Sequence, residues 1–83
     1  MNYVEIARAL IRETETYTDV CPDRAADIVR TGEWLDEQMS MLRDGSIKED
    51  ACMEQIRNAS KSAVGWKREI LEIAQFEVID LHK

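Results

Sequence analysis

Histidine, cysteine and proline are scarce in this sequence, and each shortage excludes a class of protein. The single His is the next-to-last residue, His82, so neither a Ser-His-Asp triad nor a His-based metal site is expected. The two Cys, Cys21 and Cys52, are separated by 30 residues, which matches no zinc-ligand spacing. One Pro and three Gly among 83 residues exclude a collagen-like or low-complexity chain. We therefore expect no metal, no cofactor and no catalytic residue.

Long apolar runs are also missing, since no stretch reaches the ~18 uninterrupted apolar residues that a membrane-spanning helix needs. The first turn carries Glu5 and has no basic lead, so the N-terminus is unlike a secretory signal peptide. From both observations we expect a cytoplasmic protein with no membrane partner, whose cysteines stay reduced.

Charged and apolar residues are present in the proportions of one folded helical domain, which we expect to span residues 1–83. Apolar residues make up 45% and charged residues 34% of the chain, and the net charge is −6. Residues 19–54 carry ten acidic and four basic side chains, so the whole negative excess lies in the middle third. This charge disfavours nucleic acid as a direct partner and suits a basic protein surface. Solvation of a helix face explains the same acids without any partner.

Apolar residues recur at steps of three and four, the spacing of one helical face, in three segments of the chain. The first segment predicts a helix over about residues 2–18, and the second predicts one over about 22–43 that begins at Pro22. Gly32 lies within the second segment, where an unbroken heptad phase favours a continuous helix over a break. The two stripes consist of Tyr3, Ile6, Ala7, Leu10, Thr14 and Tyr17, and of Ala25, Ile28, Gly32, Leu35, Met39 and Leu42.

A tight turn is predicted at Asp44-Gly45-Ser46. Gly45 suits the left-handed position that ends a helix, and Ser46 with Glu49 forms a Ser-x-x-Glu capping box for the next helix. Because the turn is short, the helices on either side of it are expected to be antiparallel neighbours.

The register that follows from this turn places Gly32 level with Ala59, where two small residues would let the helix backbones approach closely. Beyond the turn the third stripe continues without a Pro and predicts one helix over about 47–81, which Gly65 weakens and could kink.

The predicted fold class is therefore all-α: a three-helix antiparallel bundle with a long C-terminal helix, completed by dimerisation. The second helix covers only the first half of the third, and the first helix would either pack beside the second or run on past it to cover the exposed end. A compact bundle that buries this end within one chain is the alternative to a homodimer. The self-association surface is predicted to consist of Ile70, Ile73, Phe76 and Leu81.

Pairs of acids at i, i+3 are the remaining candidates for chemistry. They are Glu33 with Asp36, Glu69 with Glu72, and Glu77 with Asp80. Such pairs bind magnesium when two helices present them face to face, as in all-helical nucleotide pyrophosphohydrolases, but here they would not converge within one chain. A magnesium-dependent hydrolase whose site forms across a dimer is therefore the alternative function, and a solvated acidic face is the simpler interpretation.

The function predicted is that of a small acidic non-catalytic regulator or inhibitor that acts by occupying a partner protein. Small inhibitors of this kind are common in phages and mobile elements, although no residue here indicates such an origin. A structural subunit of a larger assembly is a third possibility. The outer face of the second helix supplies the predicted partner-binding residues, in which Trp34 and Met41 either contact the partner or pack on the first helix. The full set is Asp23, Asp27, Glu33, Trp34, Asp36, Glu37 and Met41.

Overall fold

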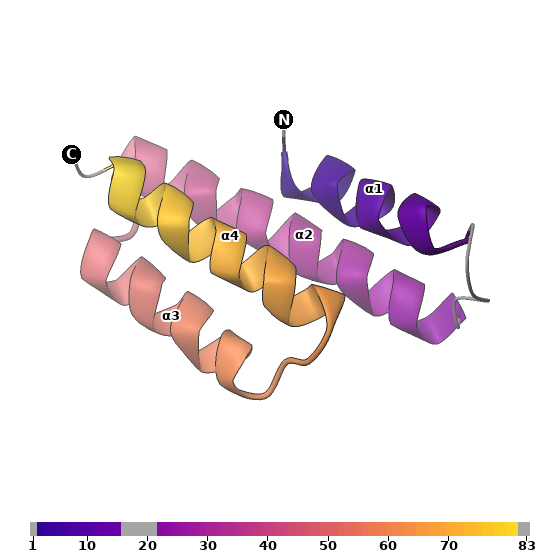
Figure 1. Ribbon diagram of the computed structural model, residues 1–83. Coiled ribbons are helices and arrows are strands. Elements are labelled where there is room, and N and C mark those ends of the chain that lie inside the picture. Colours follow the sequence, from indigo (N-terminus) through magenta and orange to yellow (C-terminus); the bar gives the residue numbers. More distant parts are fainter. Residues whose placement is uncertain (1, 16–21, 82–83) are drawn as a thin grey trace.

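A computed structural model describes residues 2–15 and 22–81, and this part of the chain folds into four α-helices with no β-strand (Figure 1). The all-helical fold class is confirmed, but the number of helices differs from the predicted three. The helices are α1 (Tyr3–Glu15), α2 (Pro22–Asp44), α3 (Glu49–Lys61) and α4 (Trp66–Leu81).

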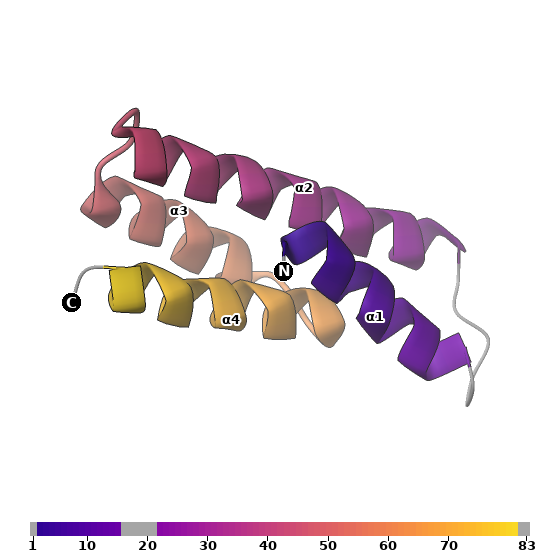
Figure 2. The ribbon, with the colours of Figure 1, turned by 90° about the horizontal axis from the view of Figure 1, so that it is seen from above.

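The longest helix, α2, extends along the whole molecule, and the other helices pack around it (Figures 1 and 2). Helix α1 runs antiparallel to α2 along its N-terminal half, whereas α3 returns antiparallel along its C-terminal half. Helix α4 reverses direction again, lies beside α3 and contacts α1, α2 and α3. The described part of the molecule measures 39 × 24 × 20 Å.

The core lies where α4 meets the other helices. Leu35 and Met39 of α2 are buried together with Cys52 and Ile56 of α3. From α4 the core receives Ile70, Leu71, Ala74 and Val78, which α4 turns toward α2 and α3.

The turn between α2 and α3 is confirmed, whereas the predicted capping box is wrong. Gly45 has φ +84°, and the Ser46 N–H donates to the Met41 carbonyl and to the Asp44 carboxylate, both at 2.9 Å. Hydrogen bonds from the Ser46 side chain and from its backbone N–H lower the pKa of the Asp44 carboxyl group. Helix α3 begins only at Glu49, with Lys48 as an N-cap that has no side-chain cap hydrogen bond. Glu49 therefore occupies the first helical position and not the third position that a capping box requires.

The predicted unbroken helix over 47–81 is also wrong, because the chain reverses at residues 62–65. Gly65 has φ +62°, a left-handed conformation that glycine adopts readily, and the Ala63 N–H donates to the Ser60 carbonyl at 3.2 Å. A straight helix of ~50 Å would leave its second half uncovered. Folding back at Gly65 buries that half against α2 and α3, and burial of each large apolar side chain stabilises by ~1.5–3 kcal/mol.

Helix α2 continues through Gly32 as predicted. The backbone that approaches Gly32 closely is that of α1, whereas Ala59 of α3 was predicted to lie there. A Cβ added at Gly32 would lie 2.7 Å from the Tyr3 carbonyl oxygen and 3.1 Å from the Val4 Cα. The backbone of the first turn of α1 therefore packs directly against α2 at Gly32.

The N-terminal end of α1 also reaches α4, where the buried Tyr3 hydroxyl donates to Glu77 at 2.6 Å. Helix α1 therefore packs mainly on α2 and touches α4 at one end. Tyr17 and Cys21 lie outside the described residues, so the place predicted for Tyr17 in the first apolar stripe is not tested.

Candidate protein-binding surface

The outer face of α4 carries three large apolar side chains that no other helix covers. Ile73, Phe76 and Ile79 are 39%, 69% and 43% exposed, and we call these three residues the α4 ridge. At 100° per residue, Phe76 points directly away from the buried side of α4, with Ile73 and Ile79 one turn before and after it. The ridge is therefore the part of α4 that the core does not use.

The predicted self-association residues are divided between this ridge and the core. Ile73 and Phe76 belong to the ridge, and Leu81 is 50% exposed at the end of α4. Ile70 is fully buried, so its assignment to an exposed surface is wrong. The reversal at Gly65 turns the Ile70 side of α4 toward α2 and α3. Ile79 was missed, although its place three residues after Phe76 put it on the same helical face.

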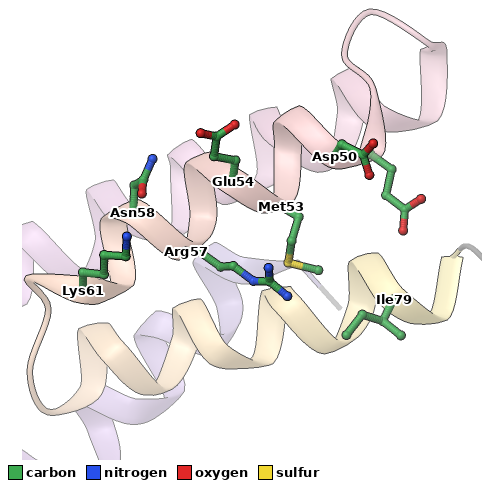
Figure 3. Close-up of a pocket in the computed structure, with 8 residues that line it drawn as sticks. Asp50, Met53, Glu54, Arg57, Asn58, Lys61 and Ile79 are labelled. Atoms are coloured by element: carbon green, nitrogen blue, oxygen red, sulfur yellow. The ribbon is translucent and has the colours of Figure 1, made fainter.

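Beside the ridge, α3 and α4 enclose an open groove of about 530 Å³ (Figure 3). Met53 of α3 and Ile79 of α4 form its apolar part, and the Arg57 side chain extends along it toward α4. The acids that line it lie toward the start of α3, and the basic groups lie toward its end. The charged lining consists of Glu49, Asp50 and Glu54 at the first end, and of Arg57 and Lys61 at the second.

A second hollow adjoins this groove toward the start of α4. Arg57 and Lys61 line both hollows, and in the second one Arg68 and Glu72 of α4 also form part of the lining. Arg68 Nε lies 3.3 Å from the Glu72 carboxylate, so the charge of Glu72 is already paired. The surface formed by α3 and α4 is therefore acidic at one end, basic at the other, and apolar between them.

Two of the predicted partner-binding acids hold helices together. Asp36 accepts hydrogen bonds from the backbone N–H groups of Tyr3 at 2.7 Å and Val4 at 3.3 Å, so it caps the N-terminus of α1. Asp27 lies 3.2 Å from the Lys67 ammonium group and links α2 to α4. The placement of Asp36 on the outer face of α2 is thus wrong, because this side chain faces α1.

The other five predicted residues are still available as a binding surface. Asp23, Glu33 and Glu37 are exposed along α2. Trp34 and Met41 are half-buried, and Trp34 packs against the core while also lining a small hollow of about 340 Å³. Their role in partner binding stays a prediction.

One acid of each pair considered for magnesium is engaged in a contact within the chain. Asp36 caps α1, Glu72 pairs with Arg68, and Glu77 accepts the Tyr3 hydroxyl. Burial, together with the Glu77 carboxylate, raises the pKa of Tyr3. Within residues 2–15 and 22–81, no three side chains of His, Cys, Asp or Glu are grouped as a metal site would need.

The single cysteine in the described part, Cys52, is buried in the core. Burial raises the pKa of its thiol. A raised pKa is typical of a cysteine that packs in a core and not of a nucleophile.

No helix in the described ranges has the length and apolar character to cross a membrane. Comparison of the chain with family models, curated proteins and solved structures found no significant match.

Proposed function

We propose that this chain is a small acidic non-catalytic regulator or inhibitor, which acts by occupying another protein. The observation that carries the proposal is the α4 ridge, where Phe76 is 69% exposed above a core that is complete without it. Leaving such side chains in water forfeits ~25 cal/mol per Å² of apolar area, which contact with another protein would recover. An exposed aromatic residue flanked by aliphatic ones is also typical of the centre of a protein interface.

The acidic side of α2 supplies the second element of this proposal. Three acids on this side are exposed: Asp23, Glu33 and Glu37. Together with the net charge of −6, they favour a partner that has a basic surface. Such charges increase the rate of encounter more than the final affinity, over a Debye length of ~8–10 Å. In this proposal the acids of α2 steer the partner, and apolar side chains hold it.

Site-specific photo-crosslinking in the source cell tests the proposal. A photoreactive amino acid is placed at Phe76, at Glu37 or, as a control, at the exposed Arg8 of α1. We expect a crosslinked product with a different protein, identified by mass spectrometry, from Phe76 or Glu37 and not from Arg8. No such product from either position would contradict the regulator. Products that contain only this chain would instead indicate a structural subunit that assembles with itself.

A further inference from the structure

The wall that α3 contributes to the groove carries one stripe of charged side chains. At 100° per residue these side chains fall within an arc of ~60° around the helix, with two acids followed by two bases. They are Asp50, Glu54, Arg57 and Lys61, which all line the groove, and we call them the α3 stripe. The stripe spans ~16 Å at 1.5 Å per residue. Within the described part of the chain no ion pair or hydrogen bond engages these four side chains, so their charges can pair with a molecule in the groove.

The floor and the opposite side of the groove are apolar. Figure 3 shows the Met53 side chain extending from α3 toward α4, where Ile79 lies beside the same groove. Met53 is only 9% exposed and forms the floor, whereas Ile79 also belongs to the α4 ridge. The ridge continues this apolar side to Phe76, about one turn before Ile79. A molecule in the groove would therefore meet charges on the α3 side and apolar side chains on the α4 side.

An amphipathic helix has the shape and the chemistry that this groove requires. Helices α3 and α4 lie side by side, and the side chains of a third helix fit between two such neighbours. The apolar residues of an amphipathic helix recur at steps of three and four along one face, so one face would cover Met53, Phe76 and Ile79 together. Charged residues beside that face would lie against the α3 stripe. Attraction then requires basic residues over the two acids of the stripe and acidic residues over its two bases.

We propose that the partner protein places an amphipathic helix in this groove, and that this helix is basic at one end and acidic at the other. The inference rests on the proposed function and names the chemistry of the segment that contacts the α4 ridge. The order of charges in the α3 stripe fixes the direction of the helix, because the reversed direction would bring like charges together. Asp23, Glu33 and Glu37 of α2 do not line the groove, so they are left to steer the rest of the partner.

A second copy of this chain does not supply such a helix. Within the described residues, the large apolar side chains that are exposed belong to α4 and to the turn before it, and they are Val64, Ile73, Phe76, Ile79 and Leu81. The ridge of α4 is already one side of the groove, and the other helices turn their apolar faces into the core. Two chains of charge −6 also repel each other. The occupant is therefore a helix of a different protein.

Photo-crosslinking from both ends of the α3 stripe tests the proposal. A photoreactive amino acid replaces Asp50 in one variant and Lys61 in another, in the full chain and in the source cell, and mass spectrometry locates the crosslinked residues of the partner. Because the two positions lie ~16 Å apart, we expect both to reach one segment of one protein, at points about 11 residues apart. An extended segment would give about five residues instead. Basic residues should surround the point reached from Asp50, and acidic residues the point reached from Lys61.

A position on the same helix provides the matched control. Gln55 is exposed on α3 but does not line the groove, so a photoreactive amino acid there should give no product with the same segment.

A variant without charges in the α3 stripe tests the electrostatic part. It combines Asp50→Asn, Glu54→Gln, Arg57→Gln and Lys61→Gln, which removes two acids and two bases and keeps the net charge at −6. With the photoreactive amino acid at Phe76, we expect at least about threefold less product from this variant than from the chain with an unaltered stripe. Circular dichroism must show the helical content of wild type, and the spacing measured in the single variants decides the proposal if this variant fails to fold.

The results that would overturn the helix are distinct from those that would overturn the proposed function. Points about five residues apart, points in separate segments, no product from Asp50 or Lys61, the same product from Gln55, or an unchanged yield from Phe76 would each contradict the helix. The proposed regulator would survive any of these results if Phe76 or Glu37 still crosslinked a different protein. If neither did, the proposed function would fail as well.

Discussion

At the scale of single residues, Gly32 is the one of the three glycines where an added methyl group would meet other atoms. Alanine normally stabilises a helix relative to glycine by ~1 kcal/mol. Here the added Cβ would lie 2.7 Å from the backbone oxygen of Tyr3, which cannot move without moving α1. The sequence predicted close approach at this glycine but assigned it to the wrong neighbouring helix.

We therefore expect Gly32→Ala to lower the free energy of unfolding by roughly 1–3 kcal/mol, the usual cost of overpacking. Urea denaturation followed by circular dichroism measures the change. Ser40→Ala, at an exposed position of the same helix, serves as the control and should be neutral or slightly stabilising. A Gly32→Ala variant as stable as wild type would mean that α1 does not sit against α2 at this point.

Tyr3 is the residue whose protonation links stability to pH. Its pKa is raised above the ordinary value of about 10 by burial and by the Glu77 carboxylate. Above pH ~10 the unfolded chain loses this proton while the folded chain keeps it, so the free energy of unfolding falls as pH rises. Below that pH the contribution of the hydrogen bond to Glu77 is fully present.

We expect Tyr3→Phe to be less stable than wild type by about 1–2 kcal/mol at neutral pH, since the hydrogen bond to a carboxylate is lost. The difference between the two proteins should narrow above pH ~10, because only wild type loses stability through this group. Urea midpoints compared between neutral pH and pH ~11 measure it. A difference that stays constant over this range would show that the Tyr3 hydroxyl is not held by Glu77.

At the scale of elements, the first turn of α1 is capped by a side chain of α2. Asp36 of α2 accepts the N–H groups of Tyr3 and Val4, and Asn2 accepts the N–H of Glu5 at 2.8 Å. These bonds satisfy donors that have no partner within the first turn of a helix, and a carboxylate there also interacts favourably with the helix dipole.

Asp36→Ala should destabilise the protein by ~1–2 kcal/mol, a typical loss for an N-terminal cap. The effect should concentrate in α1, whose amide hydrogens would exchange faster while those of α3 change little. Hydrogen exchange read by mass spectrometry resolves the two helices. Glu37→Ala, which alters the adjacent exposed acid, should leave exchange in α1 unchanged, and equal protection of α1 in wild type and Asp36→Ala would contradict the assigned cap.

At the scale of the whole molecule, the chain is too short to bury all its apolar surface. A domain of this length buries only about 60–65% of the surface that its unfolded chain exposes. The sequence predicted that apolar surface near the C-terminus would exceed its cover, and Ile73, Phe76 and Leu81 are indeed exposed. It placed Ile70 in the same surface and left out Ile79, because the face of a helix that points outward depends on the helices packed against it.

The sequence by itself determined the features that depend on neighbouring residues. The spacing of apolar residues specified helices, the heptad phase carried α2 through Gly32, and Gly45 fixed the turn after it, since periodicity and backbone preference act over a few residues. Only the tertiary structure decided that the third helix breaks at Gly65 and that Asp36 caps α1. Both follow from contacts between segments far apart in the chain, where burying one face of α4 outweighs the local preference for an unbroken helix.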